Sequence, residues 1–377
     1  MGNDVLKQRP QERGDLYEFS VVYTDRAVNL LSAPFQTVMR DISSTLREVY
    51  HAPHCALIPG SGTYAMETVA RQFGTGKKCM VIRNGYFSFR WSDIFDVCKI
   101  PSEEIVMKAQ FEKDQDLPQF QPHDLDTVVA AIKESKPAVV FAPQVETSTG
   151  MILTSDYITA VADAVHEVGG LFVVDAIAAG TMWVNMEELG IDILVTAPQK
   201  GWSGPACVGI VMLNETAKKA MDNSEPTSFC CNLPKWLTVM KKYEDGGFMY
   251  YTTLPTDSLT AFRNSMLETK EFGYENAKNA AQDLGAKIRA ICAENGCKSV
   301  SVDANAAPTV VVVYAPAKDM VARFKSVGLQ VVGGVPFKVD EPEGLVTFRI
   351  GLFGIDKLKN VDRVAATFEK AMKAAMP

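Results

Sequence analysis

The chain has 377 residues, a formal net charge of −7 at pH 7 and a sequence pI near 5.3. Apolar residues make up 47% of the chain and charged residues 22%, as in an ordinary globular protein with a large core. The acidic balance argues against a nucleic-acid surface, and the short apolar runs argue against a membrane-spanning helix.

The cysteines and histidines carry no recognisable metal site. Eight cysteines are scattered along the chain without a Cys-x-x-Cys pair, so neither a zinc site nor a thioredoxin-type motif is expected. His51 and His54 have the spacing of a ligand pair, but no third ligand accompanies them. Residues 1–15 are polar, lack the apolar segment of a secretory signal and indicate a flexible arm. We therefore expect a cytoplasmic protein without a bound metal.

The first 258 residues alternate apolar, strand-like runs with helical patterns. A first helix is expected at about residues 35–50, and a later one at 156–168 has apolar residues at i, i+3, i+4 and i+7. The expected strands cover residues 18–24, 56–58, 79–83, 138–142, 171–174, 193–196 and 208–213. Strands that alternate with helices predict an α/β fold with a mainly parallel, doubly wound sheet.

After residue 258 the pattern changes to that of a smaller α+β domain. A long helical segment at about 259–295 leads to a strand at 309–315 and a helix at 318–327. Two more strands, at 329–334 and 346–353, precede a C-terminal helix. We therefore divide the chain into an N-terminal segment (1–34), a large domain (35–258) and a small C-terminal domain (259–377).

Two of the expected strands deliver polar residues to the same edge of the sheet. Asp175 follows the strand at 171–174, and Gln199 and Lys200 follow the strand at 193–196. In open α/β sheets, ligands bind at the carboxyl ends of the strands. A carboxylate and an amine there suit pyridoxal phosphate, which binds a lysine as a Schiff base and an acidic residue at its pyridinium nitrogen.

Taken alone, each of these residues has a simpler reading. A lone lysine is usually a surface residue, and a lone aspartate at a strand end can be a helix cap or half of a structural ion pair. However, Lys200 lies among apolar, glycine and proline residues, and desolvation would lower its pKa and make it nucleophilic. A buried Asp175 without a cationic partner would be costly, so we expect it to have one.

The segment Gly60-Ser61-Gly62-Thr63 opens a helix directly after a strand. Glycines allow close approach of the backbone, the first N–H groups and the helix dipole favour an anion, and the two hydroxyls add donors. The segment is not a dinucleotide fingerprint, because position 65 is alanine where the third glycine would stand. An ordinary strand-to-helix turn is the alternative reading.

Three further segments carry candidate binding residues. The aromatic residues of Asn84–Phe87 could stack on a flat ring or belong to the core. The hydroxyls of Glu146–Gly150 could bond a phenolic oxygen or form a polar turn. Arg349 lies within an apolar strand, so it needs an anionic partner, either a substrate carboxylate or a structural carboxylate.

Together these segments resemble the class V aminotransferase family of pyridoxal-phosphate enzymes. The similarity is greatest to the branch of alanine–glyoxylate, serine–pyruvate and 2-aminoethylphosphonate–pyruvate aminotransferases, and it extends from about residue 35 over nearly the whole chain. The motifs that carry it are GSGTYAME (60–67), NGYF (84–87), ETSTG (146–150), VVDAIA (173–178), APQKGW (197–202) and FRIGLFG (348–354).

The resemblance implies pyridoxal-phosphate fold type I, that of aspartate-aminotransferase-like homodimers with the active site at the subunit interface. It implies that Lys200 forms the Schiff base and moves the proton, that Asp175 holds the pyridine nitrogen, and that Arg349 binds the substrate carboxylate. The remaining implied cofactor-binding residues are Ser61, Gly62, Thr63 and Gln199 at the phosphate, Phe87 against the ring, Thr147 near the ring, and Tyr250 and Thr253 from the second subunit.

The implied reaction is transfer of an amino group from a small alanine- or serine-like donor to a 2-oxo acid such as glyoxylate or pyruvate. One alternative is a terminal-amine donor of the 2-aminoethylphosphonate type with pyruvate. Another is a pyridoxal-phosphate lyase, either kynureninase-like or desulfurase-like, for which Cys230 and Cys231 are the candidate cysteines. A structural or nucleotide-binding protein would make all six motifs coincidental. Segment 18–35 replaces the Gly-Pro-rich loop that is usual in relatives, so the substrate stays open.

Overall fold

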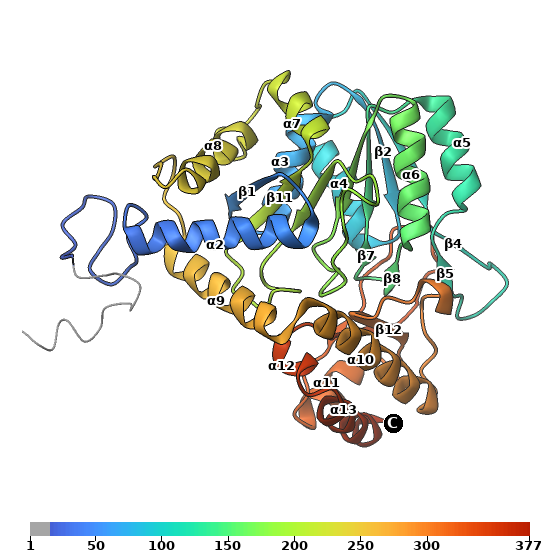
Figure 1. The fold of residues 1–377 in the computed structure, drawn as a ribbon. Helices are drawn as coiled ribbons and strands as arrows, with labels where there is room; N and C mark the ends of the chain where they lie inside the picture. Colours follow the sequence, from blue (N-terminus) through green and yellow to red (C-terminus); the bar gives the residue numbers. More distant parts are fainter. Residues whose placement is uncertain (1–15) are drawn as a thin grey trace, which may run out of the picture.

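The computed structural model describes residues 16–377, so the arm predicted at 1–15 lies outside the described residues. Its centre is a seven-stranded sheet with the order β1-β11-β10-β9-β6-β2-β3 (Figure 1). The strands are β1 (His54–Pro59), β2 (Lys78–Arg83), β3 (Glu103–Lys108), β6 (Val139–Pro143), β9 (Leu171–Asp175), β10 (Ile193–Thr196) and β11 (Val208–Leu213). Only β11 runs antiparallel to its neighbours β1 and β10, which confirms the predicted α/β fold with a mainly parallel sheet.

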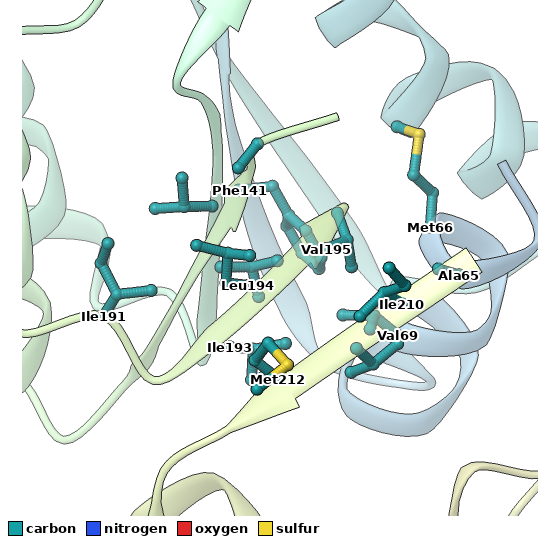
Figure 2. Packing of buried hydrophobic residues seen from close by; sticks show 14 of the residues in the cluster. Ala65, Met66, Val69, Phe141, Ile191, Ile193, Leu194, Val195, Ile210 and Met212 are labelled. Atoms are coloured by element: carbon teal, nitrogen blue, oxygen red, sulfur yellow. The ribbon is translucent and has the colours of Figure 1, made fainter. Parts of the chain in front are cut away.

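Helices cover this sheet because its central strands are apolar along their whole length. Every residue of β6, β9, β10 and β11 is buried, which requires cover on both faces of the sheet. Figure 2 shows part of this packing, with Val69 of α3 beside Ile210 of β11. The helices of this part are α2 (Ala33–Tyr50), α3 (Gly62–Gly74), α4 (Tyr86–Cys98), α5 (Leu125–Ser135), α6 (Ser155–Glu167), α7 (Glu215–Asp222) and α8 (Leu233–Glu244).

The strand predicted at residues 18–24 is wrong. This segment is irregular, and Phe19 and Val21 are more than 90% exposed. Local hydrogen bonds replace a strand ladder, since the Ser20 hydroxyl accepts from the N–H of Val22 and from the side-chain amide of Asn29. An alternating pattern forms a strand only where a neighbouring strand is available to it.

The long helical segment predicted at 259–295 consists of two helices, α9 (Thr256–Phe272) and α10 (Tyr274–Glu294). They meet at Gly273, whose φ of 95° favours glycine and ends the first helix. A three-stranded antiparallel sheet follows, with the order β12-β14-β13. Its elements and their covering helices are β12 (Val310–Tyr314), α11 (Met320–Ser326), β13 (Val332–Gly333), β14 (Thr347–Gly351), α12 (Ile355–Leu358) and α13 (Val361–Ala375).

A second hydrophobic cluster lies between α10, α13 and one face of the smaller sheet, as expected for the α+β part. Figure 1 shows α10, α13 and β12 together in the C-terminal part of the chain. The division at residues 34 and 258 stays a prediction. Short elements complete the fold: β4 (Gln110–Phe111), β5 (Phe120–Gln121), β7 (Val145–Glu146), β8 (Met151–Ile152) and the 3₁₀ turn at Asp303–Asn305. None of the helices within residues 16–377 combines the length and the apolarity needed to cross a bilayer.

Candidate active site

A cavity of about 430 Å³ lies at the carboxyl ends of the central strands. It brings together residues that are far apart in the sequence, from α3, α4, β9, β14 and the loop after β10. The predicted site residues that line it are Ser61, Gly62, Thr63, Phe87, Thr147, Asp175, Gln199, Lys200 and Arg349.

Asp175 is the last residue of β9 and is held at the sheet edge by the pairing of this strand with β10. Its carboxylate accepts one hydrogen bond, from the N–H of Ile177, and has no ion-pair partner among residues 16–377. The pKa of Asp175 is raised to about 7, mainly by burial; the Ile177 N–H and Arg90 oppose this rise and the nearby Glu146 carboxylate adds to it. A cation at this position would relieve the cost of the buried charge.

Lys200 lies in a tight loop after β10. The loop is closed by hydrogen bonds from Gly204 N–H to the Pro198 carbonyl and from Ser203 N–H to the Lys200 carbonyl. A side chain at Gly201 would place its Cβ 2.0 Å from the carbonyl oxygen of Gly180, so only glycine allows this approach. Burial, and secondarily the charge of Arg349, lower the pKa of Lys200.

The N-terminus of α3 opens into the cavity. The first N–H groups of an α-helix have no acceptor within the helix, and Ser61 makes no capping hydrogen bond with its side chain. The hydroxyl of Thr63 accepts a hydrogen bond of 3.1 Å from Arg90 Nη1. A Cβ at Gly62 would lie 2.5 Å from Ile177 Cδ1, so the helix end and the segment after Asp175 are in close contact. This arrangement suits an anion.

Phe87 is positioned by a buried carboxylate at the start of α4. Glu146 is fully buried and accepts from the N–H groups of Phe87 and Ser88, at 3.1 and 2.9 Å. It also accepts from the hydroxyls of Ser88 and Ser148. Ser148 in turn accepts from the N–H of Tyr86. In the motif at 146–150, Glu146 and Ser148 therefore hold the helix, and Thr147 faces the cavity.

Arg349 extends from β14 into the cavity. Its Nε donates to the carbonyl of Gly333 at 3.0 Å, which fixes the guanidinium, and its Cζ lies 5.6 Å from the centre of the Phe87 ring. The arginines that form ion pairs within residues 16–377 are Arg47, Arg71, Arg263 and Arg323. The terminal nitrogens of Arg349 therefore form no ion pair in this part of the chain and can bind a carboxylate from a ligand.

Two predicted residues lie outside the cavity. Tyr250 and Thr253 are exposed, and their hydroxyl oxygens are 3.4 Å apart. Of the two candidate cysteines, Cys230 is exposed and Cys231 is buried, and neither lines the cavity.

The sequence reading missed Arg90, which lines the cavity beside Phe87. The sequence spacing could have indicated it, because Arg90 follows Phe87 by three residues and residues three apart on a helix lie on the same face. No helix was predicted to begin at Tyr86, where α4 starts. Met66, Ile177 and Phe353 also line the cavity and were missed as ordinary apolar residues.

The cavity fits pyridoxal phosphate part by part. The end of α3 suits the phosphate, Phe87 offers a flat aromatic face, and Asp175 is a buried carboxylate that pairs with no cation of the described chain. The side-chain oxygen of Gln199 is buried and has no hydrogen-bond partner in residues 16–377, so it too is available to a ligand. Lys200 supplies an amine with a lowered pKa.

Known proteins are similar to this chain over most of its length. The sequence profile of the family Aminotransferase class-V matches residues 11–320. Alanine–glyoxylate aminotransferase of Rattus norvegicus is 25% identical over 349 residues, covering 89% of this chain and 80% of the relative. 2-Aminoethylphosphonate–pyruvate transaminase of Vibrio vulnificus is 26% identical over 327 residues, covering 84% of this chain and 83% of the relative.

Solved structures show the same fold. Ureidoglycine–glyoxylate aminotransferase of Bacillus subtilis superposes with a TM-score of 0.76 at 22% identity, covering 93% of this chain and 91% of the other. Alanine–glyoxylate aminotransferase of Nostoc sp. gives a TM-score of 0.77 at 19% identity, with 92% and 89% covered.

Proposed function

Because this chain belongs to the class V aminotransferase family and is thus a pyridoxal-phosphate-dependent aminotransferase, we propose that it moves an amino group from a small, alanine- or serine-like donor to glyoxylate or pyruvate. The observation that carries this proposal is one cavity that holds Lys200, Asp175 and Arg349 together. The names of the relatives support a small donor and a 2-oxo acid acceptor.

The roles of the residues follow from their surroundings. When bound, pyridoxal phosphate supplies an electron sink for the negative charge that develops at the donor Cα. Lys200 holds the aldehyde and later takes the proton from Cα, since its lowered pKa leaves a larger neutral fraction to act as base. Asp175 keeps the ring nitrogen protonated, because a cation there stabilises the buried carboxylate far more than the Ile177 N–H alone does. Arg349 binds the α-carboxylate through its two free nitrogens.

Absorbance spectra with single amino donors test the reaction. The cofactor band should fall when alanine or serine is added and return with glyoxylate or pyruvate. In the variant Arg349→Gln, kcat/KM for an α-amino acid donor should drop at least about 30-fold, because a buried guanidinium–carboxylate pair is lost. Bleaching by 2-aminoethylphosphonate alone would establish the terminal-amine alternative. A band that persists while product accumulates would indicate a lyase and contradict the proposal.

The second subunit of a homodimer is proposed to complete the phosphate site with Tyr250 and Thr253. Both side chains are exposed here and lie outside the cavity of their own chain. Phe229 and Phe248, with 68% and 48% of their surface exposed, add large apolar side chains to this region of the sequence. Exposed apolar groups near a polar pair are typical of a subunit interface.

Complementation between two inactive variants tests the shared site. Lys200→Ala and the double variant Tyr250→Phe/Thr253→Ala are co-expressed with different tags, and the mixed dimer is isolated. One of its two sites then has Lys200 and both partner hydroxyls, so about half of the wild-type activity per dimer is expected. Activity no greater than that of the double variant alone would show that these residues do not act across the interface.

We also propose that the enzyme is cytoplasmic. A second proposal is that the chain divides into an N-terminal segment (1–34), a large domain (35–258) and a small domain (259–377). The acidic composition and the scattered cysteines, which have no disulfide-like spacing, support a cytoplasmic location. The second hydrophobic cluster around α10 and α13 supports a separate small domain.

A further inference from the structure

The cavity has one cationic side chain more than the proposed function requires. Three cationic side chains line it, Lys200, Arg349 and Arg90, against one carboxylate, that of Asp175. Glu146 lies close by, but its oxygens are occupied by N–H and hydroxyl donors. Lys200 and Arg349 serve the cofactor aldehyde and the substrate carboxylate in the proposed function. The proposed function gives Arg90 no role.

Arg90 is held at the cavity wall without an acidic partner. It follows Phe87 by one turn of α4, and its Cζ lies 5.2 Å from the centre of the Phe87 ring. Its hydrogen bond within residues 16–377 is the one from Nη1 to Thr63, and it is absent from the arginine ion pairs of this part of the chain. A guanidinium carries five donors in a planar fork, so most of them remain available.

The contact with Thr63 brings this guanidinium to the N-terminus of α3. There the free N–H groups and the hydroxyls of Ser61 and Thr63 form a neutral cradle, to which the helix dipole adds only about half a charge. A phosphate group carries close to two negative charges at neutral pH. An arginine fork is the group best suited to supply the missing positive charge and two parallel hydrogen bonds.

We propose that Arg90 binds the phosphate of the cofactor, together with the N-terminus of α3 and the hydroxyl of Thr63. The inference rests on the proposed function, because it requires pyridoxal phosphate in this cavity. It adds a charged phosphate ligand from the subunit's own α4, whereas the residues assigned from the resemblance are hydroxyls, an amide side chain and a glycine. Arg90 also lies near enough to Asp175 to lower the pKa of that carboxyl, so one side chain influences both ends of the cofactor site.

Cofactor binding to the full-length, cofactor-free protein tests this proposal without any measurement of turnover. The dissociation constants of pyridoxal phosphate and of pyridoxal, which lacks the phosphate, are measured by equilibrium dialysis. Arg90→Gln should weaken binding of pyridoxal phosphate by about 10- to 100-fold, as expected when a hydrogen-bonded charge is removed. Binding of pyridoxal should change less than about twofold, and Arg90→Lys should give an intermediate loss for the phosphate form.

Arg71→Gln is the matched control, because it removes an arginine of α3 that pairs with Glu67 outside the cavity. Circular dichroism and a thermal melt verify that each variant is folded. Equal losses of affinity for pyridoxal phosphate and pyridoxal would show that Arg90 only positions the Phe87 ring. This result would overturn the proposal. Unchanged binding of pyridoxal phosphate and of pyridoxal, with a higher KM for the amino donor, would show that Arg90 binds the substrate. This result would also overturn the proposal. Failure of the wild-type protein to bind pyridoxal phosphate would instead refute the proposed function.

Discussion

Replacing Lys200 with alanine should remove the visible absorbance band of the bound cofactor and lower kcat by at least about 10⁴-fold. In the proposed function, the variant loses both the amine that holds the aldehyde and the base that moves the proton from the donor Cα. Folding should be retained, because Lys200 lines a cavity and makes no ion pair within residues 16–377. Spectra of the purified protein, followed by single-turnover kinetics, measure both effects.

The control for this experiment is Lys113→Ala, which removes an exposed lysine far from the cavity lining. It should keep the band and the activity of the wild type. A Lys200→Ala protein with an unchanged band would show that the aldehyde is held elsewhere, and the assignment of the site would be wrong. Added methylamine offers a second readout, since partial rescue of turnover is expected only where the missing group is a base.

Replacing Asp175 with asparagine should have opposite effects on catalysis and on the stability of the cofactor-free protein. In the holoenzyme, the loss of a buried charge beside the ring nitrogen should reduce kcat/KM between about 30- and 5000-fold. In the cofactor-free protein the same substitution removes a buried charge that has no ion-pair partner among residues 16–377, so it should stabilise the fold above pH 7.

The pH dependence of this stability has a definite sign. The pKa of Asp175 is raised to about 7 in the folded chain, above its ordinary value near 3.8. The folded state therefore binds a proton between these values that the unfolded state has released, and Asp175 makes the free energy of unfolding fall as pH rises through this window. The full loss is about 4 kcal/mol and is reached above pH 7.

Urea titrations of the cofactor-free protein at pH 5 and pH 8 measure this effect. The wild type should lose more stability over this range than Asp175→Asn, and Asp126→Asn, at an exposed position in the first turn of α5, should behave like the wild type. A wild type and an Asp175→Asn variant with parallel pH profiles would show that Asp175 is charged and satisfied without the cofactor.

Much of the fold could be predicted because the central strands β6, β9, β10 and β11 are short, wholly buried apolar runs. The strand at Ile193–Thr196 was predicted with its observed ends, and that at Leu171–Asp175 to within one residue. The polar residues after these strands were then predicted to meet, because parallel strands end at the same edge of a sheet. Nine predicted site residues indeed line one cavity.

The predictions that were wrong or incomplete each have a physical cause at a particular position. Residues 18–24 alternate like a strand, but no neighbouring strand pairs with them. The break at Gly273 depends on one residue with positive φ inside a long helical pattern. Arg90 was missed because its role depends on where α4 begins, and that is set by Glu146, 56 residues further along the chain. Contacts between distant segments of this kind leave no periodic signal in the sequence.

The single reversed strand of the large sheet determines when this site can form during folding. β1, which leads into Gly60, is paired with β11, and Gly60 N–H donates to the carbonyl of Cys207 at 2.9 Å. Pairing of segments so distant along the chain requires closure of a long loop, which makes it a slow and late step. The start of α3 is thus anchored only after β11 has been synthesised and docked. In the proposed function, a growing chain therefore lacks a stable phosphate site until then, and we expect retention of the cofactor to require a complete large sheet.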